Sequence, residues 1–244
     1  MPAERILILG GTGLAREAAD ALVMRGVHVV TSFAGVTRSP QLPQGEIRTG
    51  GFGGVDGLIA YLLANSFDYV VDATHPFAAQ MAAHAAVACT SVGVKLLRLE
   101  QASWQAQKGD RWQSVASIAV AVAAIPLNSK VAVTVGRKEI GAFFARADLS
   151  GVARMIEPPD VNVPAAWELM LERPPFTLAA EIDLLRANQV EILVSKNAGG
   201  ARAAKLDAAA SLSLPAIMVA RPLKPVVDSV ATVAELLGRL GLPG

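Results

Sequence analysis

Short apolar runs alternate with helix-like segments along almost the whole chain. The first run, Arg5–Leu9, ends at Gly10 and Gly11, and residues 14–25 then show helical spacing of apolar side chains. A continuous apolar run that meets a glycine turn and a helix is typical of a buried parallel strand in a βαβ unit. Parallel strands need such crossovers, which are right-handed. The pattern therefore predicts an α/β fold with parallel sheets flanked by helices.

The alternation extends over a length that suits more than one domain. At about 150 residues per domain, 244 residues correspond to roughly 1.6 domains. The polar stretch 101–113 is the best candidate for a linker. We therefore predict two Rossmann-like domains, the first over residues 1–100 and the second over 101–244, with 101–113 as linker. Such pairs usually place ligands between them, so we expect the active site in the interdomain cleft.

Several segments beyond the first apolar run are predicted as helices from their spacing. One begins at Pro76 and runs over 76–92, and the last covers 229–240 with Ser229 as its N-cap. The run 114–125 is assigned to a helix, although its Val- and Ala-rich composition also suits a strand. Two further helices are predicted over 137–146 and 165–172.

Charge and composition exclude several classes of protein. Lys and Arg number 22 against 21 Asp and Glu, so the chain lacks the clustered basic field of a nucleic-acid binder. One cysteine, Cys89, and three histidines argue against a metal site. No apolar run approaches the roughly 18–20 residues that cross a bilayer, and no signal-peptide pattern precedes Arg5. We expect a cytoplasmic protein without metal, and the oligomeric state is not readable.

The first candidate site is the turn Gly10-Gly11-Thr12-Gly13. It lies between a strand and a helix, where backbone N–H groups and the helix dipole hold phosphate. Gly11 and Gly13 match the first two glycines of G-x-G-x-x-G, whereas Arg16 replaces the third. A glycine turn that only joins strand to helix is the alternative interpretation.

The second predicted strand, within residues 27–33, ends without an acidic side chain. NAD sites usually carry Asp or Glu there to bind the ribose 2′-hydroxyl. This chain has Ser32, Thr37 and Arg38 instead. A hydroxyl and a guanidinium suit a 2′-phosphate, so NADP is favoured over NAD. The alternative is that Arg38 is a solvated loop residue.

Further polar segments follow other predicted strands. In Asp72-Ala-Thr-His-Pro-Phe-Ala78, residues Thr74, His75 and Pro76 are placed near a nicotinamide, or they only cap a helix. Basic side chains also gather at strand ends. They suggest an anionic substrate with several carboxylates, unless nearby acids balance them. The predicted substrate-binding residues are Arg137, Lys138, Lys196 and Asn197, and Arg98 and Arg221 also close strands.

Four segments in one order resemble the precorrin-6A reductase family of the cobalamin pathway. The resemblance covers nearly the whole chain, although Leu14 and Ala15 depart from the acidic-then-glycine form of the family's turn. It implies NADPH-dependent reduction of one double bond of the precorrin-6A macrocycle to give precorrin-6B. It also implies NADPH in the first domain and a tetrapyrrole between the two domains. The segments are Gly10-Gly-Thr12, Asp72–Ala78, Thr134-Val-Gly-Arg-Lys138, and Ser195-Lys-Asn-Ala-Gly-Gly200 followed by Arg221-Pro222.

The mechanism that we expect transfers a hydride from nicotinamide and a proton to the neighbouring carbon. Lys196 and His75 are candidate proton donors, with solvent as the alternative. A cobalt-precorrin-6A reductase or a non-catalytic NADP-sensing module stays open. A methyltransferase is another alternative, but S-adenosylmethionine has no 2′-phosphate for Ser32 and Arg38 to bind. A short-chain reductase is disfavoured because neither Tyr61 nor Tyr69 has a lysine four residues later.

Overall fold

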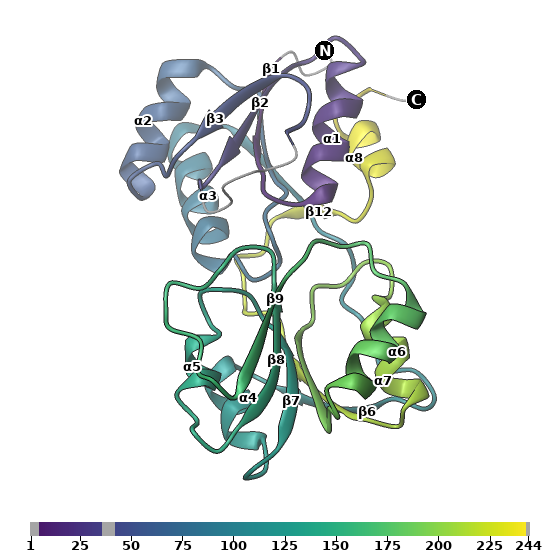
Figure 1. Cartoon of the computed structure of the whole chain (residues 1–244). Coiled ribbons are helices and arrows are strands. Elements are labelled where there is room, and N and C mark those ends of the chain that lie inside the picture. The colour runs from purple at the N-terminus through teal and green to yellow at the C-terminus, as the bar shows by residue number, and fades with distance from the viewer. Residues whose placement is uncertain (1–4, 36–41, 243–244) are drawn as a thin grey trace. The chain divides into compact units, whose positions relative to one another are not determined.

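The chain forms two compact α/β units (Figure 1). The computed structural model describes residues 5–35 and 42–242. Unit 1 contains Met1–Ala102 and Leu223–Gly244, and unit 2 contains Ser103–Pro222. Each unit has one six-stranded sheet in which the paired strands are parallel. The predicted α/β class with two parallel sheets is therefore confirmed, while the interdomain position of the active site stays a prediction.

The sheet of unit 1 has the order β12-β5-β4-β1-β2-β3. The central strand β1 pairs with β2 on one side and β4 on the other, so that Leu9 lies opposite both Ser32 and Asp72. The carboxyl ends of these three strands therefore share one edge of the sheet. The strands are β1 (Arg5–Leu9), β2 (His28–Phe33), β3 (Glu46–Thr49), β4 (Tyr69–Asp72), β5 (Lys95–Leu99) and β12 (Asp228–Val230).

Helices cover both faces of this sheet (Figure 1). Helices α1 (Gly13–Val23) and α8 (Val233–Arg239) pack on one face, and α2 (Val55–Asn65) and α3 (Ala79–Val92) on the other. Ile6 and Ile8 belong to the first core, whereas Leu7 and Leu9 belong to the second. Alternate residues of a strand point to opposite faces, so a strand covered on both sides must be apolar throughout.

Unit 2 repeats the arrangement with the order β6-β11-β10-β7-β8-β9. Helices α6 (Leu178–Ala187) and α7 (Ala204–Ser211) pack together on one face, and α4 (Ile118–Ala124) and α5 (Gly141–Phe144) lie on the other (Figure 1). The strands are β6 (Arg111–Val115), β7 (Lys130–Thr134), β8 (Ser150–Met155), β9 (Trp167–Leu171), β10 (Ile192–Lys196) and β11 (Pro215–Val219).

The two units exchange strands, which the predicted division of the chain did not include. Strand β6 follows β5 in sequence but pairs with β11 of unit 2. Strand β12 follows β11 but pairs with β5 of unit 1, and α8 packs there as well. The predicted linker 101–113 therefore belongs mostly to unit 2, and residues 223–244 leave the predicted second domain. A local pattern predicts a strand but does not determine which sheet the strand joins.

Two predicted helices are partly or wholly strand. Residues 165–172 contain the edge strand β9, which pairs with β8 on one side. Strand β9 is short and lies at the edge of the sheet, so only Trp167 of its residues is buried. Its sequence therefore shows no clear alternation of apolar and polar residues. In the run 114–125, Val115 ends β6 and the helix starts after Ser117, whose side chain accepts a hydrogen bond from the Val120 N–H.

Helix limits also differ from the prediction at three places. Helix α3 begins at Ala79 rather than at Pro76, because a turn closed by the Ala78 N–H and the His75 carbonyl precedes it. In the predicted helix 137–146, only Gly141–Phe144 is α-helical. Thr232, rather than Ser229, caps α8 by accepting from the Glu235 N–H, because Ser229 lies within β12.

Candidate active site

The carboxyl edge of unit 1 brings three predicted segments together. Gly10 follows β1, Ser32 lies on β2, and Ala73 and Thr74 follow β4. The Gly10 N–H donates to the Ser32 carbonyl at 2.9 Å, and the Thr12 hydroxyl donates to the Ala73 carbonyl at 2.9 Å. The glycine turn is therefore tied to both neighbouring strand ends.

The glycine turn has a conformation that requires glycine and places it at the start of α1. Gly11 has φ +115°, a conformation that L side chains rarely adopt, and a Cβ on Gly10 would lie 2.9 Å from Thr31 Cγ2. Thr12 caps α1 by accepting from the Ala15 N–H at 3.0 Å. The Thr12 hydroxyl is thus used within the protein, and its role is to hold the turn. The first N–H groups of α1 carry the positive end of the helix dipole, which suits a phosphate.

A cation to which the sequence pattern gave no role lies beside the end of β2. Ser32 is buried, and its Oγ accepts from Arg48 Nη1 at 3.1 Å. Arg48 lies on β3 directly opposite Ser32. An arginine at the end of a short strand, before the glycines of 50–54, was the available signal. Arg38, the predicted cation, lies outside the described residues.

The loop after β4 is stabilised by a buried ion pair. Asp72 is 1% exposed, and its Oδ1 accepts from the Thr74 hydroxyl at 2.6 Å. Arg98 Nε donates to Asp72 Oδ2 at 3.2 Å, and Arg98 Nη1 donates to the Pro225 carbonyl at 2.9 Å. Arg98 was expected to face an anionic substrate. It is instead committed to Asp72 and to the segment that returns to unit 1.

His75 and Pro76 lie in the turn in front of α3, where His75 is exposed and Pro76 is partly buried. His75 Nδ1 accepts from the Phe77 N–H at 3.2 Å, and the two rings lie 5.7 Å apart. An accepting Nδ1 places the proton of a neutral imidazole on Nε2. The turn therefore fixes the orientation of the ring.

Unit 2 has a corresponding edge at the carboxyl ends of β7 and β10. Lys196 Nζ lies 2.5 Å from Glu139 Oε1, which joins the two predicted substrate-binding segments. Arg137 Nη1 lies 3.5 Å from Asp160 Oδ1, and Lys138 is exposed. This edge thus collects the predicted cations, although acids balance two of them.

Asn197 is engaged within the protein by an unexpected partner. Its side-chain amide donates to the Trp104 carbonyl at 2.9 Å and accepts from the Trp104 N–H at 2.8 Å. The Trp104 indole in turn donates to the carbonyls of Gly200 and Ala201. Arg221, the other strand-closing cation, donates to the carbonyls of Asn197 and Ala198. Asn197 therefore shapes the loop 196–201 through its amide.

A second lysine lies at this edge and was given no individual role from the sequence. Lys205, on α7, donates to the Thr134 hydroxyl at 2.9 Å, and its Nζ lies 5.9 Å from the centre of the Trp104 ring. Burial lowers the pKa of Lys205 to about 8, with Arg154 acting in the same direction and Glu181 opposing it. This side chain therefore changes charge near pH 8, well below the range of an exposed lysine.

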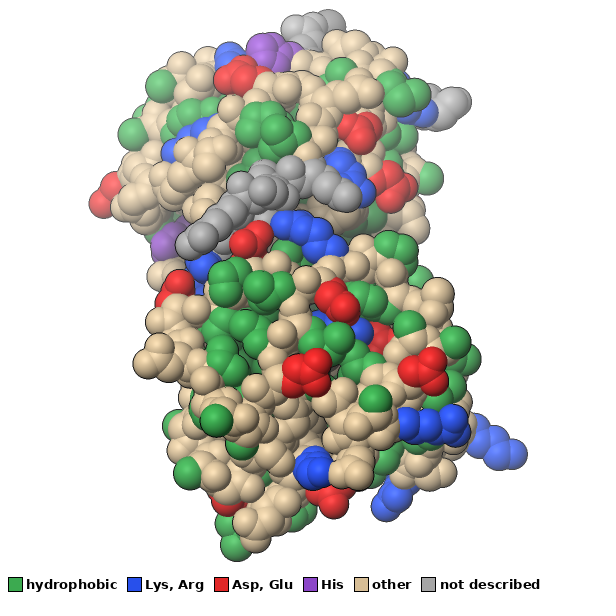
Figure 2. Space-filling model, in the orientation of Figure 1, with side chains coloured by type: hydrophobic (Ala, Val, Ile, Leu, Met, Phe, Trp, Pro, Cys, Tyr) green, Lys and Arg blue, Asp and Glu red, His purple; other side chains and the backbone are tan. Residues whose placement is uncertain are grey.

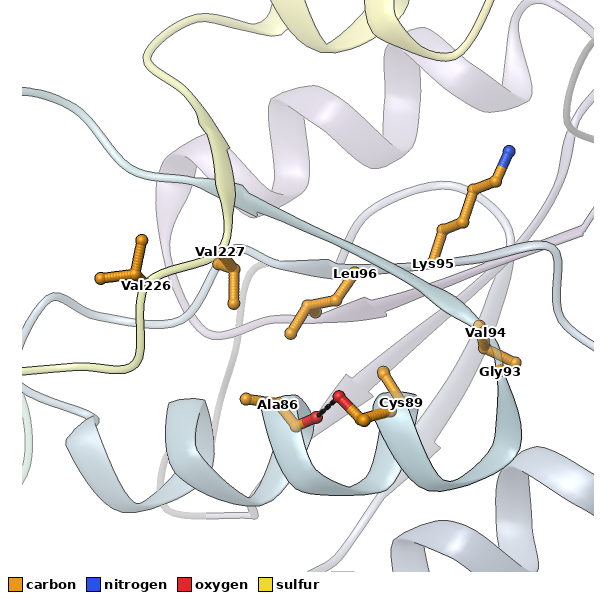
Figure 3. Close-up of a pocket in the computed structure, with 9 residues that line it drawn as sticks. Ala86, Cys89, Gly93, Val94, Lys95, Leu96, Val226 and Val227 are labelled. Atoms are coloured by element: carbon orange, nitrogen blue, oxygen red, sulfur yellow. Dashed lines mark hydrogen bonds between the residues drawn. The ribbon is translucent and has the colours of Figure 1, made fainter.

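A groove of about 340 Å³ in unit 1 lies away from these edges (Figure 3). Lys95 and Leu96, at the amino end of β5, line it together with Cys89 and Thr90 of α3, and the Thr90 hydroxyl donates to the Ala86 carbonyl at 2.8 Å. Burial raises the pKa of the Cys89 thiol to about 12, so this group stays protonated. The groove contains no residue of the predicted site.

The visible surface also lacks a strong charge field. Figure 2 shows Lys and Arg side chains interspersed with Asp and Glu.

Among the described residues, no helix combines the length and the apolar character that a membrane span requires.

Comparisons with known proteins give one consistent result. The model of the precorrin-6x reductase CbiJ/CobK family matches residues 5–240. The precorrin-6A reductase of Rhodococcus erythropolis is 44% identical over 97% of both chains. That of Rhodobacter capsulatus is 43% identical over 97% of this chain and 95% of its own. A solved structure of a CobK precorrin-6A reductase superposes with a TM-score of 0.89, at 41% identity over 98% of each chain.

The match extends over both units and both sheets rather than over one unit alone. It agrees with the family that the four sequence segments indicated. The chain therefore belongs to the precorrin-6x reductase family, whose members are reductase enzymes.

Proposed function

We propose that this chain reduces precorrin-6A to precorrin-6B with NADPH as the cofactor. The observation that carries the proposal is the carboxyl edge of unit 1. There the glycine turn, the acid-free end of β2 and the loop 72–76 meet through direct hydrogen bonds. Relatives of nearly the same length are named precorrin-6A reductase, which supports the same substrate for this chain.

The residues at this edge fit a phosphorylated dinucleotide. The turn Gly10–Gly13 and the amino end of α1 suit the pyrophosphate. Ser32 and Arg38 suit the 2′-phosphate, as the sequence indicated, and Thr74, His75 and Pro76 suit the nicotinamide end. NADPH, when bound, supplies the hydride.

The substrate would be held by the basic edge of unit 2. Arg137, Lys138 and Lys196 are suited to the carboxylates of the macrocycle, since charge-assisted hydrogen bonds are the strong ones. Asn197 contributes by fixing the loop that carries Lys196. Glu139 orients the Lys196 ammonium and offsets part of its charge.

The proton would come from Lys196 or His75. Lys196 Nζ is positioned by Glu139, and the His75 ring is oriented by the Phe77 N–H. Lysine and histidine are both among the side chains that serve as general acids. Substituting each by alanine tests the assignment: near wild-type turnover in both variants would remove them and leave solvent as the donor.

The experiment that tests the function combines binding and turnover. Calorimetric titration with NADPH, NADH and S-adenosylmethionine is expected to give tight binding of NADPH alone. Incubation with NADPH and precorrin-6A should then yield a product heavier by two hydrogens. Binding of S-adenosylmethionine instead, or NADPH binding without any reduction, would contradict the proposal.

A cobalt-containing substrate is the second candidate. A cobalt-precorrin-6A reductase of Priestia megaterium is 27% identical over 89% of this chain. The higher identity to precorrin-6A reductases favours the cobalt-free macrocycle. Turnover of the two substrates side by side distinguishes them.

A further inference from the structure

Arg48 occupies an unusual position among the basic residues of unit 1. It lies at the carboxyl end of β3, opposite Ser32 of β2. Its guanidinium is held by acceptors without charge: Ser32 Oγ at 3.1 Å, the Gly50 carbonyl at 2.6 Å and the Gly51 carbonyl at 3.0 Å. It also lies over the Phe52 ring, 3.8 Å from the ring centre.

No acid neutralises this cation within the described part of the chain. Among those residues, no carboxylate lies within ion-pair distance of Arg48. Glu46, two residues earlier on the same face of β3, instead contacts His28 at 3.3 Å. By contrast, Arg98 is paired with Asp72. A fixed positive charge without a counter-ion is suited to an anionic ligand.

The guanidinium also keeps donors for such a ligand. Both Nη1 hydrogens and one Nη2 hydrogen go to Ser32, Gly50 and Gly51. The Nε–H and the other Nη2–H remain. Donors on neighbouring nitrogens of a planar fork match two oxygens of a phosphate.

Ser32 connects this cation to the glycine turn. Its backbone carbonyl accepts from the Gly10 N–H at 2.9 Å, while its Oγ accepts from Arg48. The pyrophosphate site and Arg48 thus lie on the two sides of one residue. In a dinucleotide the adenosine ribose lies between the pyrophosphate and any 2′-substituent, and Rossmann folds recognise that substituent near the end of the second strand.

We infer that Arg48 binds the 2′-phosphate of NADPH and is the residue by which this enzyme distinguishes NADPH from NADH. The inference rests on the proposed function, because it requires a nicotinamide dinucleotide at the glycine turn. It differs from the sequence prediction in assigning this role to β3 rather than to Arg38.

Calorimetry with Arg48→Gln tests the assignment. The variant should bind NADPH roughly 10- to 100-fold more weakly, the range for a lost hydrogen-bonded charge, while its affinity for NADH changes little. Adenosine 2′,5′-bisphosphate should lose affinity in the same proportion, and adenosine 5′-monophosphate should not. These two probes isolate the 2′-phosphate from the nicotinamide and from turnover.

Two further variants separate recognition from folding. Arg48→Lys keeps the charge but not the fork, and we expect an intermediate preference for NADPH. Arg25→Gln removes an exposed arginine that follows α1 and whose side chain donates to the Ala21 carbonyl, and it should leave the preference unchanged. Circular dichroism shows whether each variant is folded. The readout is the ratio of the NADPH and NADH affinities. Loosening of the loop at Gly50 would weaken the binding of both cofactors alike and leave this ratio unchanged.

The possible outcomes distinguish this inference from the proposed function. An equal loss of NADPH and NADH affinity would make Arg48 a structural brace and overturn the inference. Unchanged affinities in Arg48→Gln, with the preference lost in Arg38→Ala, would also overturn it and leave the reductase proposal intact. If the wild-type chain bound neither cofactor, with and without the tetrapyrrole, both proposals would fail.

Discussion

Lys205 shows how the surroundings of one residue determine its chemistry. Its ammonium donates to the Thr134 hydroxyl and lies near the buried ion pair of Arg154 and Glu181. Burial disfavours the charged form and lowers the pKa from 10.5 to about 8. Between these two pH values the folded chain binds fewer protons than the unfolded chain. The free energy of unfolding must therefore rise with pH in that window.

Replacing Lys205 with methionine should remove this pH dependence. Below pH 8 the variant avoids the cost of a buried charge, which is at most ~3 kcal/mol at about 1.4 kcal/mol per pKa unit. Its stability relative to wild type should be greatest near pH 7 and should decline towards pH 10. Urea unfolding of both proteins across this range measures the difference. Lys108→Met, at an exposed lysine, is the control. A difference that stays constant with pH would contradict the assignment.

At the scale of elements, the start of α1 links helix stability to the proposed cofactor site. The Thr12 hydroxyl both caps the helix and ties the glycine turn to the loop after β4. Thr12→Val should cost ~1–2 kcal/mol of stability and weaken NADPH binding, while Thr12→Ser should preserve both. Thr177→Val removes the corresponding cap of α6 in unit 2. We expect a similar loss of stability there without loss of NADPH affinity. Calorimetry measures the NADPH affinity and thermal unfolding measures the stability. An equal loss of NADPH affinity in both valine variants would contradict the prediction.

The same elements show how much of the site the sequence could predict. Glycine turns and polar residues after apolar runs are local signals. They are the basis on which Gly10–Gly13, the 72–78 loop and Lys196 are predicted to belong to the site. The contribution of a side chain from a neighbouring strand is a tertiary property. Arg48 reaches Ser32 only because β3 pairs with β2, and Asn197 contacts Trp104 across 93 residues of sequence. Such partners could not be read from spacing.

The edges of the sheets were the least predictable part of the fold. Strand β9 has a partner on one side only, and β12 has three residues. Short edge strands need little apolar sequence, so their patterns are weak. Central strands such as β1 and β10 are buried on both faces, and their continuous apolar runs indicated them directly.

At the scale of the whole molecule, the exchange of strands makes each unit depend on a distant part of the chain. The core of unit 1 on the α1 face contains residues of β1 and α1 together with Val230, Val233 and Leu236 from the last segment. Residues up to Leu236 must therefore be synthesised before this core can close. The site at the carboxyl edge of β1 depends on the same core, since α1 packs directly against α8.

This dependence predicts that a substitution in α8 weakens cofactor binding. Leu236 has no exposed surface, so Leu236→Ala should cost ~2–5 kcal/mol. It should also lower NADPH affinity, because α1 loses part of its support. Leu223 is 98% exposed, and Leu223→Ala is the matched control that should change neither property. Thermal unfolding and calorimetry on the full chain measure both effects. If Leu236→Ala lowered stability while NADPH affinity stayed at the wild-type value, the site would be independent of the returning segment.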